Sequence, residues 1–165
     1  MSESFTIRRA ELADVPIIAR HRAQMFRDMG ELEDAQYPSL VEATRRLVTR
    51  MIQAGEYVAW LAAPAGRAEV VAGAGVQLRT LLPRPIAGRG AIREGPEAIV
   101  LNVYTEPAWR RKGAARALME HVIRWAREQG VGRLVLHASL EGRPLYEQLG
   151  FEPTNEMRFM GALDG

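Results

Sequence analysis

The stretch Leu101–Ala115, with the sequence LNVYTEPAWRRKGAA, contains three structural signals in succession. It begins as an apolar strand, continues through a short loop that ends in a basic, glycine-containing turn, and leads into the start of a helix. Such a turn directs free backbone N–H groups, the positive end of the helix dipole and cationic side chains toward one point. The stretch therefore predicts a diphosphate-binding turn, with a phosphate-bearing cofactor lying across the end of the strand.

Apolar periodicity predicts the elements on either side of this stretch. The expected elements are a strand at Phe5–Arg9, a helix at Glu11–Met29 capped by Asp14, a second helix from Ser39 to about Gln53, paired strands at Glu56–Ala63 and Glu69–Leu82, a loop at Pro83–Pro96, a central strand at Glu97–Tyr104, a helix at Lys112–Gln129, a strand at Arg133–His137, a short helix at Arg143–Leu149, and a terminal strand or hairpin at Phe151–Met160. Strands with interposed helices predict an α/β or α+β sheet. Gly73 and Gly75 fall inside an expected strand, where a bulge or close packing explains them better than phosphate binding.

The composition excludes several classes of protein. At 165 residues, with 47% apolar and 25% charged residues, the chain predicts one globular domain over residues 1–165. The absence of cysteine excludes disulfides, thiolate metal sites and a cysteine acyl-enzyme. The formal net charge of +2 is too small to indicate nucleic acid as a partner. No apolar run is long enough to span a membrane, and Met1–Ser4 lacks the pattern of a secretory signal, so we expect a cytoplasmic location.

Two segments carry a resemblance to a known family. The run Arg110-Arg111-Lys112-Gly113-Ala114-Ala115 resembles the pyrophosphate signature of the GNAT superfamily of acyl-CoA-dependent N-acetyltransferases. The segment Ala138–Phe151, which ends in Tyr-Glu-Gln-Leu-Gly-Phe, resembles the closing strand and helix of that family. The resemblance implies a mixed central sheet of about six or seven strands flanked by about four helices, with acetyl-CoA as co-substrate and no metal.

The resemblance also assigns the cofactor contacts. Val103 would hydrogen-bond the pantetheine arm, the Leu101 amide would face the thioester carbonyl and stabilise the oxyanion, and Ser139 replaces a cofactor-contacting Asn with a shorter side chain. The diphosphate would be bound by the cations Arg110, Arg111, Lys112 and Arg116 and by the amides from Gly113 through Ala114 and Ala115 to Arg116. The alternative is a basic, solvated helix start, with Leu101 and Val103 as ordinary core residues.

Two residues are candidates for proton transfer. The resemblance places Tyr146 where a general acid protonates the departing thiolate; the alternative is a packing residue. Glu97 lies four residues before Leu101, roughly 13 Å along a strand, so it could act as a base only through water; the alternative is an exposed glutamate at the strand entry. Even spacing predicts that Glu97, Leu101 and Val103 share one face. The three histidines have no metal-like spacing, and His137 could relay protons or be structural.

The acceptor is not identified by the sequence. The resemblance places the loop before the central strand beside the acceptor, so its arginines could attract an anionic acceptor; the alternative is an ordinary solvated loop. Glu31, Glu33 and Asp34 could instead attract a cationic amine. The loop arginines are Arg79, Arg84, Arg89 and Arg93. The leading hypothesis is an N-acetyltransferase that transfers acetyl from acetyl-CoA to a primary amine of a small molecule or peptide in a ternary complex. The alternative is a catalytically idle acyl-CoA-binding sensor. No nucleic-acid motif and no membrane partner is indicated, and the resemblance allows a homodimer.

Overall fold

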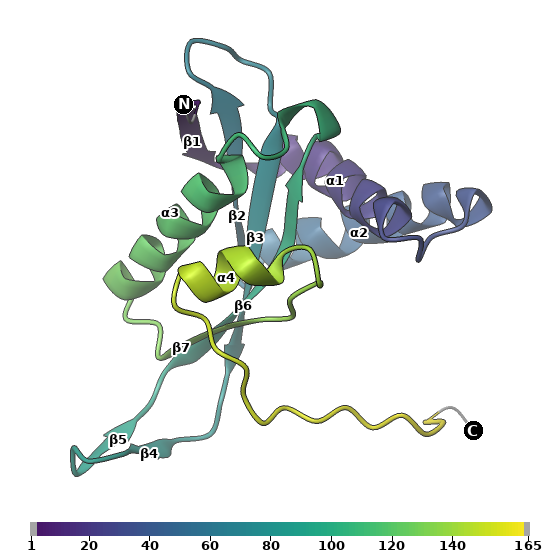
Figure 1. Cartoon of the computed structure of the whole chain (residues 1–165). Helices are drawn as coiled ribbons and strands as arrows, with labels where there is room; N and C mark the ends of the chain where they lie inside the picture. Colours follow the sequence, from purple (N-terminus) through teal and green to yellow (C-terminus); the bar gives the residue numbers. More distant parts are fainter. Residues whose placement is uncertain (1–2, 164–165) are drawn as a thin grey trace.

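The computed structural model describes residues 3–163; Met1, Ser2, Asp164 and Gly165 lie outside the described residues. Five strands form the central sheet in the order β1-β2-β3-β6-β7 (Figure 1). Their bounds are β1 Phe5–Arg9, β2 Tyr57–Pro64, β3 Ala72–Thr80, β6 Pro96–Thr105 and β7 Arg133–Leu136. All neighbouring pairs are antiparallel except β6 and β7, which are parallel. The sheet is therefore mixed, as the sequence predicts.

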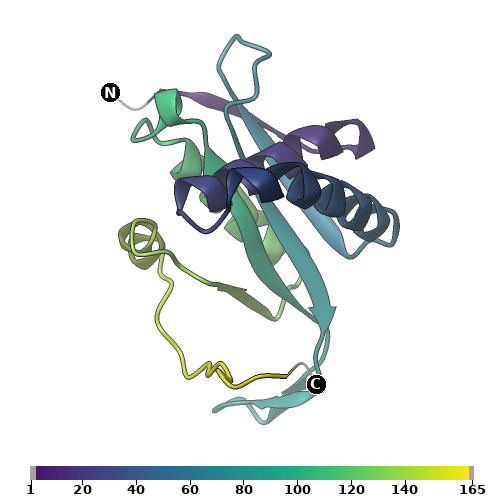
Figure 2. The same ribbon diagram turned by 90° about the vertical axis from the view of Figure 1, so that its right-hand side faces the viewer.

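Helices cover both faces of this sheet. Figure 2 shows α1 (Val15–Asp28) and α2 (Tyr37–Gln53) on the near face, with α3 (Ala114–Glu128) behind the strands. The short helix α4 (Arg143–Gln148) follows β7, and single 3₁₀ turns lie at Leu12–Asp14, Asp34–Gln36 and Pro107–Trp109. Pro16, Pro38 and Pro144 lie in the first turns of α1, α2 and α4, where a missing N–H has no cost.

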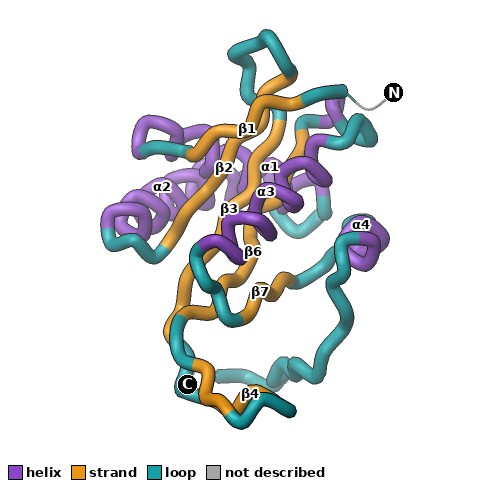
Figure 3. The backbone as a smooth tube through the Cα atoms, turned by 90° about the vertical axis from the view of Figure 1, so that its left-hand side faces the viewer, coloured by secondary structure: helices purple, strands orange, loops and turns teal. Residues whose placement is uncertain are grey.

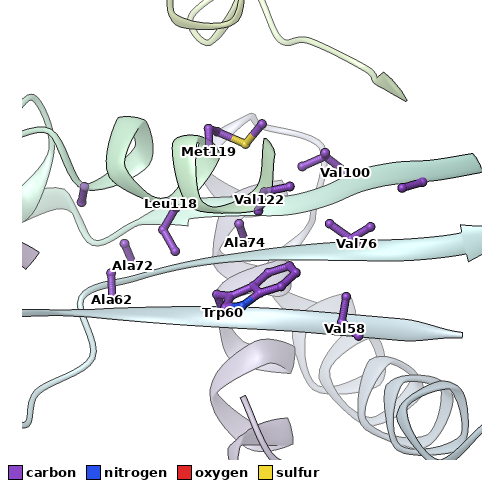
Figure 4. Close-up of a cluster of buried hydrophobic side chains, with 12 residues drawn as sticks. Val58, Trp60, Ala62, Ala72, Ala74, Val76, Val100, Leu118, Met119 and Val122 are labelled. Atoms are coloured by element: carbon purple, nitrogen blue, oxygen red, sulfur yellow. The ribbon is translucent and has the colours of Figure 1, made fainter. Parts of the chain in front are cut away.

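The core forms as two layers because the side chains of β2 alternate. Val58, Trp60 and Ala62 pack with Leu118, Met119 and Val122 of α3 (Figure 4), which are fully buried. Residues between them, such as Ala59 and Leu61, pack instead with α1 and α2. Truncating a buried Leu or Met in such a layer costs about 2–5 kcal/mol. This packing holds α3, and therefore the turn that precedes it, firmly against the sheet.

The glycines of β3 allow close packing, as predicted. A Cβ on Gly75 would lie 1.8 Å from the Tyr57 hydroxyl, so only glycine leaves room for that buried phenol. A Cβ on Gly73 would lie 3.1 Å from His21 Nδ1. Opposite these glycines the register shifts, and Asn102 adopts a left-handed conformation with φ 61°. The irregularity is a β-bulge in β6, which asparagine tolerates better than most residues.

Three local predictions need correction. Asp14 precedes α1 but makes no cap to it; its carboxylate instead binds Arg8 and the Glu11 N–H. The loop at 83–96 contains a small antiparallel ribbon made of β4 (Arg84–Ile86) and β5 (Ala91–Arg93), drawn as short orange segments at the bottom of Figure 3. The terminal strand expected at 151–160 is wrong, because that described segment is extended but unpaired. Pro153 removes a ladder donor there, and Met157 is 93% exposed.

Candidate active site

The turn before α3 presents a set of unused backbone donors. Gly113 is the N-cap residue with φ 95° and ψ 0°, and no side chain caps the helix. Arg111 is also left-handed, with φ 60°. Within residues 3–163, the backbone N–H groups of residues 111–116 donate to no protein acceptor. Successive N–H groups arranged in this way form a concave anion site at the positive end of a helix dipole.

The cations of this turn are mostly engaged with other parts of the protein. Arg110 donates to the Asp28 carboxylate at the end of α1 and to the Thr105 carbonyl, 3.1 Å away. Lys112 Nζ lies 3.3 Å from Glu3 Oε1 and 4.6 Å from the centre of the Trp109 ring. The fourth predicted cation, Arg116, donates to Gln148 of α4.

Arg111 differs from the other three cations. Among the described residues it makes no ion pair or side-chain hydrogen bond, and it lies in the left-handed part of the turn. Its charge is therefore available to an anion. The engaged cations hold the turn in place from three directions, while the backbone amides and Arg111 remain to bind a ligand.

The strand that leads to the turn separates from its neighbour. Pairing of β6 with β7 runs from Glu97 opposite Arg133 to Val100 opposite Leu136 and then ends, although β6 continues to Thr105. Figure 2 shows the two strands diverging beyond this point. Leu101 and Val103 therefore lie on the part of β6 that is free of β7. An extended ligand could pair with this edge, as the sequence resemblance implies.

Tyr146 projects from α4 toward the α3 side of the sheet. It packs against the cluster that contains Leu118 and Val122, and its ring lies edge-on to Phe151 with centroids 6.0 Å apart. Burial raises the pKa of the phenol, so the hydroxyl stays protonated at neutral pH. Packing and proton donation are compatible roles for this side chain.

Ser139 stabilises the entrance to α4. Its Oγ accepts a hydrogen bond from the Gly142 N–H at 3.1 Å, and its carbonyl accepts one from the Arg143 N–H at 3.0 Å. The Ser139 hydroxyl lies close enough to Tyr146 that a Cβ on Gly142 would contact both side chains. Ser139 therefore positions the helix that carries Tyr146.

Glu97 lies in an environment that weakens a base. It is buried, and its carboxylate accepts hydrogen bonds from Arg79 of β3 and Arg133 of β7. Burial favours the neutral carboxyl, but the two arginines outweigh burial and lower the pKa of Glu97 below its usual value. The carboxylate crosslinks three strands where the β6–β7 pairing begins.

The predicted common face of Glu97, Leu101 and Val103 is wrong for Val103. The bulge at Asn102 inserts one residue, so Val103 packs on the α3 side with the cluster that contains Val100. Strict alternation holds only on the Glu97 side of the bulge.

The charges expected near an acceptor are also partly engaged. Arg79 binds Glu97, and Arg93 donates to the Gly132 carbonyl. Arg27 Nη2 lies 3.1 Å from Asp34 Oδ1. These contacts bring the loop before β6 against β7 and fix the connection between α1 and α2.

Sequence reasoning missed the acidic partners Asp28, Glu3 and Glu156. Asp28 binds Arg110, Glu3 binds Lys112, and Glu156 contacts His137. Each contact joins segments far apart in the chain, so no local pattern signals it. Asn102 was detectable, because Asn is enriched at left-handed positions.

Comparison with known proteins defines the family. The profile of the acetyltransferase (GNAT) family matches residues 26–151. The chain belongs to this family, and its mixed sheet and helices form the GNAT fold. A crystal structure of a GCN5-related N-acetyltransferase from Ralstonia eutropha JMP134 has a TM-score of 0.80 and 28% identity, covering 94% of this chain and 97% of that one. A predicted acetyltransferase from Clostridium acetobutylicum, solved with acetyl-CoA, has a TM-score of 0.76 and 23% identity, covering 96% of each chain.

A sequence relative is the ribosomal protein bS18-alanine N-acetyltransferase of Escherichia coli K12. It is 36% identical over 73 residues, which cover 42% of this chain and 49% of that enzyme. The match thus spans about half the length of this relative. Within the described residues, no helix is long and apolar enough to cross a membrane.

Proposed function

We propose that this protein transfers an acetyl group from acetyl-CoA to a primary amine by direct attack in a ternary complex. The observation that carries the proposal is the row of backbone N–H groups at residues 111–116 that have no acceptor within the described residues. These groups lie at the helix N-terminus, at the end of β6, whose edge is free of β7 beyond Val100. A diphosphate satisfies these donors, and a pantetheine arm extends from it along Leu101 and Val103. This geometry suits CoA better than a compact phosphate ligand.

Each step of the transfer has a residue suited to it. We assign to the Leu101 amide, as the family resemblance implies, the donation of a hydrogen bond to the thioester carbonyl as that oxygen gains negative charge. The acceptor nitrogen attacks the carbonyl carbon directly, since the chain has no cysteine to form an acyl-enzyme. The C–S bond then breaks, and the Tyr146 hydroxyl protonates the thiolate. The raised pKa of Tyr146 keeps that proton in place until the thiolate forms.

The acceptor is proposed only as a class. The Escherichia coli relative is named as an N-acetyltransferase of an alanine of ribosomal protein bS18, and a structural neighbour is an aminoglycoside N-acetyltransferase. The acceptors named for these two enzymes, an alanine and an aminoglycoside, carry primary amines that are protonated at neutral pH. We therefore propose a peptide amino terminus or an amino sugar as the first acceptors to test.

The proposal is tested by calorimetric titration with acetyl-CoA, CoA and a duplex DNA, followed by measurement of thiol release with an alanine-initiated peptide and an aminoglycoside. Binding of acetyl-CoA without DNA binding, and thiol release with an amine, is the expected result. Acetyl-CoA binding with no thiol release from any acceptor indicates an idle acyl-CoA sensor. Absence of CoA binding overturns the assignment of the turn.

A further inference from the structure

His137 occupies the point at which the two strands separate. It directly follows Leu136, the last paired residue of β7, just as Leu101 directly follows Val100, the last residue of β6 that pairs with β7. Leu134 and Leu136 pack on the α3 side, so the alternation of β7 directs His137 to the opposite side. Tyr146 packs on the α3 side. By this alternation the two side chains lie on opposite faces of the sheet.

A carboxylate from the C-terminal segment orients the imidazole. Glu156 Oε1 lies 2.6 Å from His137 Nε2. A carboxylate can only accept, so Nε2 carries a proton in this contact, and in the neutral imidazole Nδ1 then has the free lone pair. The side chains are 66% and 61% exposed, which leaves the imidazole accessible to an incoming molecule.

We infer that His137 is the general base for the acceptor amine and that Glu156 is its positioning residue. The inference rests on the proposed function. It also gives the C-terminal segment a role: the segment forms no strand in residues 151–163, yet Glu156 brings it to the end of β7. Glu97 is less suited to this role, because two arginines hold its carboxylate ionised and buried.

The protons of the reaction balance with these residues. A bound ammonium loses one proton to solvent and becomes a neutral amine, which attacks the thioester carbon. The nitrogen then carries a second proton, which passes to His137 Nδ1 as the C–N bond forms; Glu156 stabilises the resulting imidazolium. Tyr146 gives its phenol proton to the sulfur as the C–S bond breaks, and the imidazolium returns a proton to the phenolate through water. The products are the amide, CoA thiol and one released proton.

The kinetic test compares His137→Gln and Glu156→Gln with wild type under saturating acetyl-CoA. The acceptors are the alanine-initiated peptide, an aminoglycoside and a small primary amine such as butylamine at high concentration. We expect kcat to fall roughly 100-fold or more in His137→Gln and less in Glu156→Gln, with the acetyl-CoA dissociation constant unchanged. His121→Gln on α3 is the matched control and should keep wild-type kcat. Added imidazole should partly restore His137→Ala.

A second measurement does not depend on turnover. Nitrogen-15 NMR of the histidine rings should show His137 as the Nε2–H tautomer in wild type, and a mixture of tautomers in Glu156→Gln. An Nδ1–H tautomer in wild type, or unchanged kcat in His137→Gln while Tyr146→Phe is impaired, overturns the inference and leaves the proposed function standing. If wild type binds acetyl-CoA but releases no thiol with any acceptor, the proposed function fails and the role of His137 as a base fails with it.

Discussion

Arg110 and Asp28 join two parts of the protein that are 82 residues apart in the chain. The guanidinium donates to the carboxylate at the end of α1, and its centre lies 5.8 Å from the centre of the Tyr104 ring. Arg110 therefore spans from the turn to α1. The ion pair holds the turn against the end of α1.

This pairing predicts an indirect effect of Asp28→Asn on cofactor binding. The Arg110 contact weakens, the turn loses one of its supports, and we expect acetyl-CoA affinity to fall about two- to fivefold, since a partly exposed pair contributes about 0.5–1 kcal/mol. Calorimetric titration measures the change. Glu42→Gln is the control, because it removes an exposed ion pair with Arg45 that lies within α2. Equal affinities for Asp28→Asn and wild type would show that the pair does not support the site.

Gly113→Asp should abolish detectable binding of CoA. The substitution adds negative charge beside the diphosphate and a side chain at φ 95°, where residues other than glycine are strained. The strain alone also lowers stability, so a matched variant is needed. Gly130→Asp, with φ 66° just beyond the other end of α3, carries similar strain far from the turn. Calorimetry should show CoA binding in Gly130→Asp and none in Gly113→Asp; retained binding in both refutes the assignment of the turn.

Tyr146→Phe should reduce turnover and spare cofactor affinity. The variant keeps the ring that packs against Phe151 and removes only the proton donor. Loss of a general acid lowers kcat by roughly 10²-fold or more. Steady-state thiol release and acetyl-CoA titration separate the two effects. Tyr37→Phe, on α2, is a control for removing a phenol elsewhere. A Tyr146→Phe enzyme with wild-type kcat would leave this side chain with a packing role alone.

The local features of the candidate site could be predicted from the sequence. The apolar strand, the left-handed glycine and the helix that follows are each specified by neighbouring residues, so RRKGAA predicts the turn and the position of α3. The Leu-Gly-Phe sequence that directly follows α4 likewise allows the position of Tyr146 to be predicted. Such features depend on propensity and dihedral preference, which act over a few residues.

The partners of the charged side chains could not be predicted in this way. Arg110 and Glu97 appear in the sequence as free ionic groups, but each is paired with residues brought near by the sheet. The bulge at Asn102 reverses the face of Val103, because one inserted residue shifts a period of two. Both outcomes depend on tertiary register, which the local pattern does not contain.

Glu97→Gln should destabilise the protein, chiefly by leaving Arg79 and Arg133 without their carboxylate. We expect the free energy of unfolding to fall by about 1–3 kcal/mol at pH 7. Since the pKa of Glu97 is lower in the folded state than the ordinary value of 4.5, its contribution is present above that value and is lost as pH falls through the folded pKa. In urea unfolding, the difference in stability between wild type and Glu97→Gln should therefore be larger at pH 7 than at pH 3.5. Glu147→Gln removes an exposed pair with Arg143 and should change little.

His21 should make stability depend on pH in the range where histidines titrate. Its side chain is buried beside Tyr104, with ring centroids 5.0 Å apart, and its Nε2 lacks a hydrogen-bond partner among the described residues. Burial and, to a smaller extent, the nearby Arg20 lower the pKa of His21 to about 4, although Glu106, 3.6 Å from Nε2, opposes them. The folded protein therefore binds this proton less readily than the unfolded chain.

The sign of the effect follows from that difference. Between about pH 6.5 and pH 4 the unfolded state binds more protons, so the free energy of unfolding of wild type decreases as the pH falls, by at most about 1.4 kcal/mol per pH unit for this residue. His21→Gln keeps a polar side chain without the titration, and its stability should fall less steeply over the same range. Urea unfolding at pH 7, 6, 5 and 4.5 measures both slopes.

The half-buried His121, whose pKa is also lowered by burial, provides the control. His121→Gln should flatten the dependence of the free energy of unfolding on pH less than His21→Gln does. Parallel slopes for wild type and His21→Gln would mean that His21 is protonated inside the folded protein.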